Sequence, residues 1–142
     1  MSISQIIAGQ DYAVITCTPQ DDVREAARIL ADKRIGALPV MEGEAVVGIF
    51  SERDLLYCIA RDGASALDSK VADLMTAPAI TIDSKGDARA ALSLMTKRRI
   101  RHLPVVEEDK LVGFVSIGDL VKYRIELAEA EAQQMREYIT AT

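Results

Sequence analysis

The sequence predicts an α+β fold in which two copies of one βαββα motif pack against each other with pseudo-two-fold symmetry, followed by a C-terminal helix. Three observations lead to this prediction. Identities recur at a constant offset of 65 residues, each copy repeats the same order of helix and strand patterns, and an amphipathic stripe follows the second copy. One copy of fewer than about 60 residues buries too little apolar surface to fold alone, so we expect the two copies to share a core.

The repeat runs through both halves and needs no gap between Ala13 and Cys58. An ungapped match of this length indicates a duplicated motif. The shared segments are Ile15-Thr16 with Ile80-Thr81, Arg34-Ile35 with Arg99-Ile100, Leu38-Pro39-Val40 with Leu103-Pro104-Val105, Ser51 with Ser116, and Asp54-Leu55 with Asp119-Leu120.

Each copy is expected to contain the same elements. The patterns predict a short strand (Val14–Cys17, Ala79–Ile82), a helix (Asp22–Lys33, Asp87–Arg98), a hairpin (Ala37–Met41 with Ala45–Phe50, His102–Val106 with Lys110–Val115) and a final helix (Ser51 to about Ala60, and from Ser116). Small and polar residues 61–69 predict a loop. Val71–Met75 predicts a helical turn that mirrors Ile3–Ile7. The expected parts are residues 1–65, 66–125 and 126–142: first motif with its lead-in, second motif, and helical tail.

Composition excludes several classes of protein. The formal net charge of −5 argues against sequence-independent nucleic-acid binding. No apolar run reaches the roughly 20 residues that span a bilayer, and the first residues lack the features of a signal peptide, so we expect an intracellular, cytoplasmic protein without a membrane segment. Cys17 and Cys58 are isolated and predict buried thiols, not a disulfide, and a single histidine argues against a histidine-based metal site.

Ser51-x-x-Asp54 and Ser116-x-x-Asp119 stand where a strand is predicted to run into a helix. One interpretation is a capping box, in which serine and acid hold the free amides of the first helical turn. The other is a ligand site, because a helix N-terminus attracts phosphate and a carboxylate accepts two hydrogen bonds from a ribose diol. The pattern alone leaves both interpretations open.

Basic residues gather at the end of the second predicted helix: Lys97, Arg98, Arg99, Arg101 and His102. Lys97 and Arg98 suit the helix dipole, but Arg101 and His102 replace Gly36 and Ala37 of the first copy, so we expect two clefts that are not equivalent. Arg53, whose counterpart is Gly118, stands against the dipole in a first helical turn. It is either simply exposed or placed to meet an anion.

The repeated pattern resembles the cystathionine-β-synthase (CBS) domain, present as a tandem pair. The resemblance covers Ile3 to Ile125, and the residues that carry it are Arg34–Val40 with Gly48–Leu55, Arg99–Val105 with Gly113–Leu120, and the lead-in Val71–Thr76. It implies a non-catalytic regulatory module that binds AMP, ADP, ATP, NAD or S-adenosylmethionine between the copies and commonly dimerises.

The resemblance also implies roles for single residues. Asp54 and Asp119 would hold the ribose, with Ser51 and Ser116 near the phosphates. Arg101 and His102 would contact phosphate, and the adenine would pack on residues of the short strands and the hairpin: Ile15, Thr16, Ile80, Thr81, Leu103 and Pro104.

The tail carries an apolar stripe spaced by four and three residues: Val121, Ile125, Ala128, Ala132, Met135 and Ile139. It predicts either a solvated helix lying on its own domain or a helix that packs on a second chain in a homodimer. Alanine at two positions makes such a seam weak.

Three functions remain in competition. The first is an adenine-nucleotide sensor that regulates an unknown partner protein, and the basic cluster favours a phosphate-bearing ligand (AMP, ATP or NAD) over cationic S-adenosylmethionine. The second is an interaction module with degenerate clefts. Catalysis is the least supported, since the sequence holds no nucleophile beside a base, no metal cluster and no nucleotide-loop motif.

Overall fold

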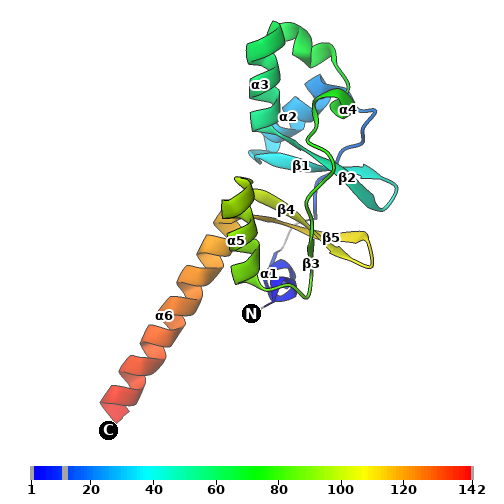
Figure 1. The fold of residues 1–142 in the computed structure, drawn as a ribbon. Helices are drawn as coiled ribbons and strands as arrows, with labels where there is room; N and C mark the ends of the chain where they lie inside the picture. Colours follow the sequence, from blue (N-terminus) through cyan, green and yellow to red (C-terminus); the bar gives the residue numbers. More distant parts are fainter. Residues whose placement is uncertain (1, 11–12, 142) are drawn as a thin grey trace.

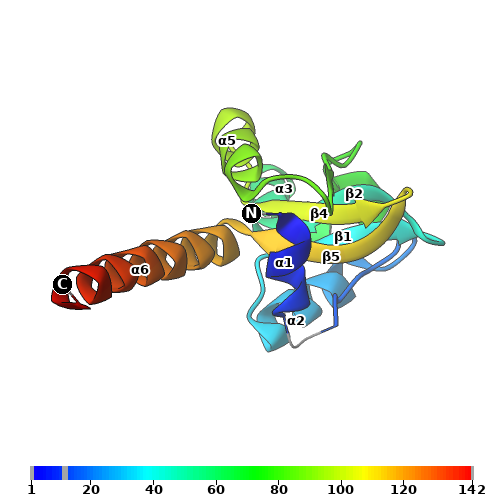
Figure 2. The ribbon, with the colours of Figure 1, turned by 90° about the horizontal axis from the view of Figure 1, so that it is seen from below.

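The two repeats form two similar halves that face each other, with one long helix extending from the second (Figure 1, Figure 2). The structure is a computed structural model and describes residues 2–10 and 13–141. It confirms the predicted α+β fold of two related motifs and a C-terminal helix.

The first half consists of α2 (Val23–Lys33), β1 (Ala37–Glu42), β2 (Ala45–Ser51) and α3 (Glu52–Asp62). Asp22 is the N-cap residue of α2, and Arg34 ends the helix in the left-handed conformation at φ 54°. β1 and β2 form an antiparallel hairpin whose register shifts after Val40. The apolar face of α2 covers the hairpin, which is why Val23, Ala26 and Leu30 are buried.

The second half repeats these features 65 residues later. It consists of β3 (Ile82–Asp83), α5 (Ala88–Arg98), β4 (His102–Glu107), β5 (Lys110–Ser116) and α6 (Ile117–Ala141). Arg99 ends α5 at φ 54°, as Arg34 ends α2, and the register of the hairpin shifts after Val105, as it does after Val40. The duplication therefore extends to irregular backbone as well as to sequence.

The short first strands are shorter than predicted. Val14–Cys17 contributes a single bridge from Cys17 to Val40, and Ala79–Ile82 is reduced to β3, which pairs in parallel with β4. A proline explains the limit in each copy. Continued pairing toward the N-terminus would require an N–H from Pro39 or Pro104, and proline has none. Of the unpaired residues, Val14, Ile15, Ala79 and Ile80 line the space between the halves.

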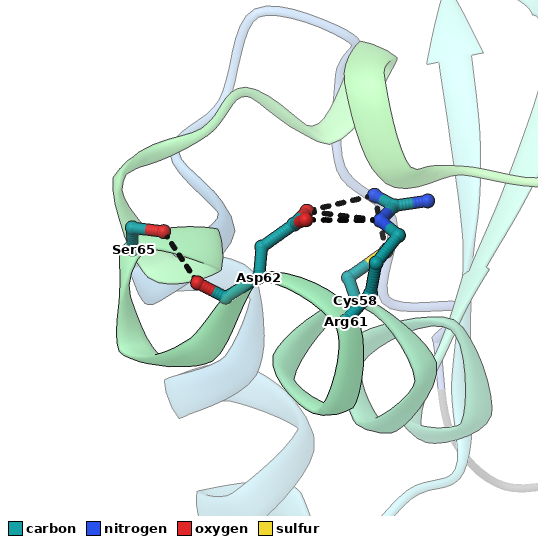
Figure 3. A network of polar contacts seen from close by, with 4 residues as sticks. All are labelled: Cys58, Arg61, Asp62 and Ser65. Carbon is teal, nitrogen blue, oxygen red and sulfur yellow. Dashed lines mark hydrogen bonds and ion pairs between the residues drawn. The ribbon is translucent and has the colours of Figure 1, made fainter.

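The predicted loop at residues 61–69 is also wrong. α3 continues to Asp62, and a 3-10 helix, η1 (Gly63–Asp68), follows it. Figure 3 shows how the junction is held: the Arg61 guanidinium bonds Asp62, and Ser65 Oγ donates to the Asp62 carbonyl at 2.8 Å. Ala66 is 2% exposed in the first core, so burial of this small side chain orders a segment whose composition predicts a loop.

Each half has its own hydrophobic core, and each core is completed by the lead-in helix that precedes the other repeat in the sequence. α1 (Ile3–Ala8) places Ile3 and Ile6 in the core of the second half. α4 (Val71–Leu74) places Val71 and Leu74 in the core of the first half. Backbone hydrogen bonds fix both helices, from Ile3 N to Gly86 O and from Val71 N to Asp21 O. The chain thus crosses between the halves twice, which ties their folding together.

Cys17 and Cys58 are free and buried. Burial, with a smaller contribution from Asp21, raises the pKa of the Cys17 thiol to about 12, so this thiol is held in its unreactive form. None of the helices in residues 2–10 and 13–141 has the length and apolar character needed to cross a membrane.

Candidate ligand clefts between the two copies

Two clefts lie where the halves meet, one at the start of α3 and one at the start of α6. We name them by their acids: the Asp54 cleft, with a volume of about 400 Å³, and the Asp119 cleft, with about 270 Å³. Each combines the helix start of one half with the short first segment and the α2–β1 or α5–β4 junction. Gly36 and His102 line both clefts and form the wall that they share.

Pseudo-two-fold symmetry relates the linings almost position by position. The Asp54 cleft is lined by Gly36, Ile49, Ser51, Glu52, Arg53, Asp54, Tyr57, Thr76, Pro78, Ala79, Ile80, Arg99, Ile100, Arg101 and His102. The Asp119 cleft is lined by Ala13, Val14, Ile15, Arg34, Ile35, Gly36, Ala37, His102, Phe114, Ser116 and Asp119. Both therefore offer an acid at a helix N-terminus, an isoleucine from a short segment and an arginine that ends a helix.

Asp54 performs the capping task and also reaches the cleft. Its Oδ2 accepts the Ser51 amide and hydroxyl at 3.0 Å each, and Ser51 Oγ accepts the Asp54 amide at 3.2 Å, which is the capping box. Its Oδ1 accepts the hydroxyl of Thr76 at 2.9 Å. The cap fixes the carboxylate at the cleft wall, and one oxygen is held only by a side-chain hydroxyl that a ligand hydroxyl can replace.

Thr76 is brought to Asp54 by a close approach of two backbones. Thr76 and Ile49 exchange hydrogen bonds of 2.8 and 2.9 Å. Gly48, beside Ile49, makes room for them, because a Cβ there would lie 2.9 Å from the Thr76 carbonyl and 2.8 Å from Met75 Sδ. The segment that leads from α4 toward Ile80 is thus anchored on β2, and it forms the apolar side of the cleft.

Three arginines give the Asp54 cleft a positive side. Arg99 and Arg101 come from the α5–β4 junction, and Arg53 comes from the first turn of α3. Arg53 crosses between the halves and donates from Nη1 to the Arg99 carbonyl at 3.3 Å. It therefore satisfies a carbonyl at the end of α5, which accounts for a cation at a helix start without any ligand.

The Asp119 cleft has the same cap as the Asp54 cleft but fewer positively charged side chains. Asp119 Oδ2 accepts the Ser116 amide at 2.8 Å and the Gln10 side chain at 3.4 Å. Arg34 is the arginine of this lining, because Gly36 and Gly118 stand where the other half has Arg101 and Arg53. The unequal clefts that the sequence predicts are thus present, and the larger one carries the added cations.

His102 lies between the clefts with its ring stacked on Phe114, at a centroid distance of 5.4 Å and an interplanar angle of 14°. A Cβ on Gly36 would come within 3.1 Å of the imidazole, so the two halves meet tightly here. Burial lowers the pKa of His102 below its ordinary value and Arg101 lowers it further, while Glu52 and Asp119 oppose the shift. The ring is accordingly neutral near pH 7, and its contacts with Phe114 and Gly36 are packing contacts.

The sequence-predicted residues separate into three groups. Ser51, Arg53, Asp54, Ile80, Arg101 and His102 line the Asp54 cleft. Ile15, Ser116 and Asp119 line the Asp119 cleft, together with His102. Neither lining includes Thr16, Thr81, Leu103 or Pro104. The two threonines are exposed, and the Leu103-Pro104 pair is buried in the core behind the cleft wall.

Several lining residues were missed by sequence reasoning. Arg34 and Arg99 stand at matching positions of the repeat, and this match is the signal that could have identified them. In the structure both end a helix in the left-handed conformation, which directs the backbone into the cleft wall. Thr76 and Tyr57 carry no such signal, because their place depends on how the halves dock. Among the residues that the structure describes, no group of three metal-ligating side chains gathers anywhere.

The family model for the CBS domain matches the chain twice, over residues 10–61 and 71–126. The chain belongs to the CBS-domain family. It is a tandem CBS pair, since the two matches coincide with the two halves of the fold.

Relatives agree with this assignment. The CBS pair is 37% identical over 134 residues to a CBS domain-containing protein, CBSX3, assigned to mitochondria in Arabidopsis thaliana; the match covers 91% of this chain and 65% of that protein. It resembles the crystal structure of a CBS-domain protein from Agrobacterium tumefaciens at 34% identity and a TM-score of 0.82, covering 87% of this chain and 99% of that one.

A more distant CBS structure, CBSX2 in complex with AMP, shares the fold at 23% identity and a TM-score of 0.77. That match covers 89% of this chain and 98% of the other.

Proposed function

We propose that this CBS pair is a regulatory module that binds an adenine nucleotide in the Asp54 cleft and transmits the binding to a partner protein. The observation that supports it is the meeting of three kinds of group in one space of about 400 Å³: a carboxylate at a helix start, three arginines and an apolar wall that includes Ile80. A cleft of this size suits a small ligand, and a nucleotide can use all three kinds of group through its ribose, phosphates and base.

The proposed pose follows from the chemistry of the lining. The ribose hydroxyls would donate to Asp54 and displace the hydroxyl of Thr76. The adenine would lie on the apolar side with Ile80, and the phosphates would lie toward Arg101. Arg53 would reach them only by leaving the Arg99 carbonyl, so phosphate binding would release a bond between the halves.

That exchange offers a way to signal. The Arg53–Arg99 bond joins the first turn of α3 to the end of α5, one element from each half. A ligand that competes for Arg53 binds the two arrangements with different affinity, which is the requirement for a ligand-induced shift. The output would pass to another polypeptide or to a homodimer of this chain, and no residue is needed for catalysis.

A second site in the Asp119 cleft belongs to the same proposal, with Ser116, Asp119, Ile15 and His102 in the corresponding roles. Its acid is already bound by Gln10, and its volume is about 270 Å³, so we expect weaker binding there. The same observation supports the competing hypothesis of an interaction module with degenerate clefts, for this cleft alone.

Thermal unfolding with and without ligand tests the proposal. A ligand present at 100 times its Kd stabilises the fold by about 2.7 kcal/mol. AMP, ADP, ATP and NAD should raise the melting temperature, and S-adenosylmethionine, a cation, should raise it less at the same concentration. If none of them shifts it, the nucleotide proposal fails and the interaction module takes its place.

A further inference from the structure

The distal part of α6 presents an apolar seam that its own domain does not cover. Figure 1 and Figure 2 show the helix extending well beyond the body of the molecule. Val121, Ile125 and Met135 are 44%, 54% and 64% exposed. With Ala128, Ala132 and Ile139 they recur at alternating spacings of four and three, the a and d positions of three heptads.

The domain uses the opposite side of the same helix. Leu120 is fully buried in the second core and Tyr123 packs against it. At 100° per residue, these c and f positions point away from the a and d seam. A second helix can therefore approach the seam without displacing the contacts that hold α6 on its own domain.

The charges beside the seam specify the partner. In heptad terms Arg124 and Glu131 occupy g positions, and Glu129 and Arg136 occupy e positions. Two parallel helices in register set each g residue against the e′ residue five positions on. The pairs so formed are Arg124 with Glu129′ and Glu131 with Arg136′, and both are attractive.

The antiparallel arrangement that aligns all six seam positions gives the reverse. It sets Glu129 against Glu129′, Glu131 against Glu131′, and Lys122 against Arg136′, all of like sign. Furthermore, Arg124, Glu129, Glu131 and Arg136 have no oppositely charged residue three or four positions away on their own helix, and none forms a salt bridge within the described residues. Lys122, by contrast, is paired with Glu126 on its own helix at 4.0 Å.

We propose that α6 docks with α6 of a second copy of this chain as a parallel, in-register coiled coil over Val121–Ile139. This specifies the homodimer of the proposed function and rests on that part of it alone. Alanine at two of the six seam positions lets the helices approach closely but buries little surface, so the dimer is concentration-dependent.

Disulfide trapping in the full-length protein tests the orientation. Ala132→Cys places a thiol at a position that meets itself only in the parallel register, and mild oxidation should convert most of the protein to a covalent dimer. Ala130→Cys, on the side away from the seam, is the matched control and should form no disulfide-linked dimer, and neither should the wild type with its buried Cys17 and Cys58. Equal trapping at both positions, or none at either, would overturn the proposal.

A charge-reversal cycle tests the pairing, with sedimentation equilibrium as the readout. Arg124→Glu should weaken dimerisation roughly ten-fold, because two symmetry-related attractions become repulsions, and adding Glu129→Arg should restore it. Failure of the double variant to recover would contradict the parallel register. Calorimetric titration of the same variants with AMP separates the two proposals, since all of them should bind nucleotide as the wild type does.

Discussion

The Asp54 and Asp119 clefts are built from positions 65 residues apart, yet they offer a ligand different chemistry. Both have the capped acid, an isoleucine and an arginine that ends a helix. Among the positions that differ between the two halves, three have an arginine or histidine in one half only: Arg53 for Gly118, Arg101 for Gly36, and His102 for Ala37. Duplication therefore supplied the scaffold twice, while a few substitutions in both halves, around the Asp54 cleft, concentrated positive charge in that cleft.

Substitutions of the two capped acids, Asp54 and Asp119, should differ most in their effect on AMP affinity. Asp54→Asn should reduce affinity for AMP by about 10- to 100-fold, because a hydrogen bond to a charged group contributes roughly 1.5–3 kcal/mol. Asparagine keeps an oxygen for the Ser51 amide, so the cap and the melting temperature should change little. Asp119→Asn is the matched control and should lower affinity much less in the same calorimetric titration. A larger loss at Asp119 would reverse our ranking of the clefts.

The arginines come next. Arg101→Ala should weaken ATP about ten-fold and leave adenosine nearly unchanged, since a guanidinium contributes mainly to the phosphates. Arg34→Ala, in the Asp119 cleft, should have little effect on either ligand. Fluorescence competition with adenosine, AMP and ATP measures the series. Equal losses for adenosine and ATP would show that Arg101 does not contact phosphate.

Alanine substitutions of the two hairpin glycines should differ more in their effect on AMP affinity than in their effect on the free energy of unfolding. Gly48→Ala and Gly113→Ala each force a contact near 2.8 Å, with Met75 and Ile7 respectively, and overpacking of this kind destabilises a fold by roughly 1–3 kcal/mol. Only Gly48 also abuts the Thr76 carbonyl beside the Asp54 cleft. Urea unfolding should therefore show a similar loss in the free energy of unfolding for both variants. AMP affinity should fall several-fold for Gly48→Ala alone. Unchanged AMP affinity in that variant would separate the anchored segment from the ligand site.

The smallest expected effect concerns pH. The pKa of His102 is lowered in the folded state, chiefly by burial, so the unfolded chain binds more protons as pH falls below the ordinary value of 6.5. This group therefore contributes a loss of stability on acidification, beginning near pH 6.5 and ending below its folded pKa. His102→Ala, which copies Ala37 of the other half, should flatten the dependence measured by urea unfolding between pH 7.5 and 5.5. An identical slope in the variant and the wild type would show that His102 is not the group responsible.

The fold could be predicted from the sequence because each copy of the repeat gives the same pattern of helices and strands. Helices, hairpins and lead-ins appear within a few residues of their predicted limits, since apolar periodicity and caps such as Asp22 are local signals. The 3-10 helix after α3 was not predicted, because it depends on the burial of Ala66 in the first core. The packing of α1 and α4 on opposite halves was not predicted either, because the sequence of an apolar helical turn does not show which core it joins.

The sequence predicts single residues of the candidate clefts better than it predicts which of them share a cleft. The acids, Arg101 and Ile80 do line clefts. What the sequence could not show is that Arg101 shares its cleft with Asp54 and not with Asp119 of its own half. The pseudo-two-fold axis decides this, because it places the start of each terminal helix against the helix–strand junction of the other copy.

A crystal structure of the protein soaked with AMP would show directly which cleft holds the nucleotide. We expect AMP in the Asp54 cleft, with its ribose hydroxyls on Asp54, its adenine beside Ile80 and its phosphate next to Arg101. AMP bound only in the Asp119 cleft, or outside both clefts, would contradict this expectation.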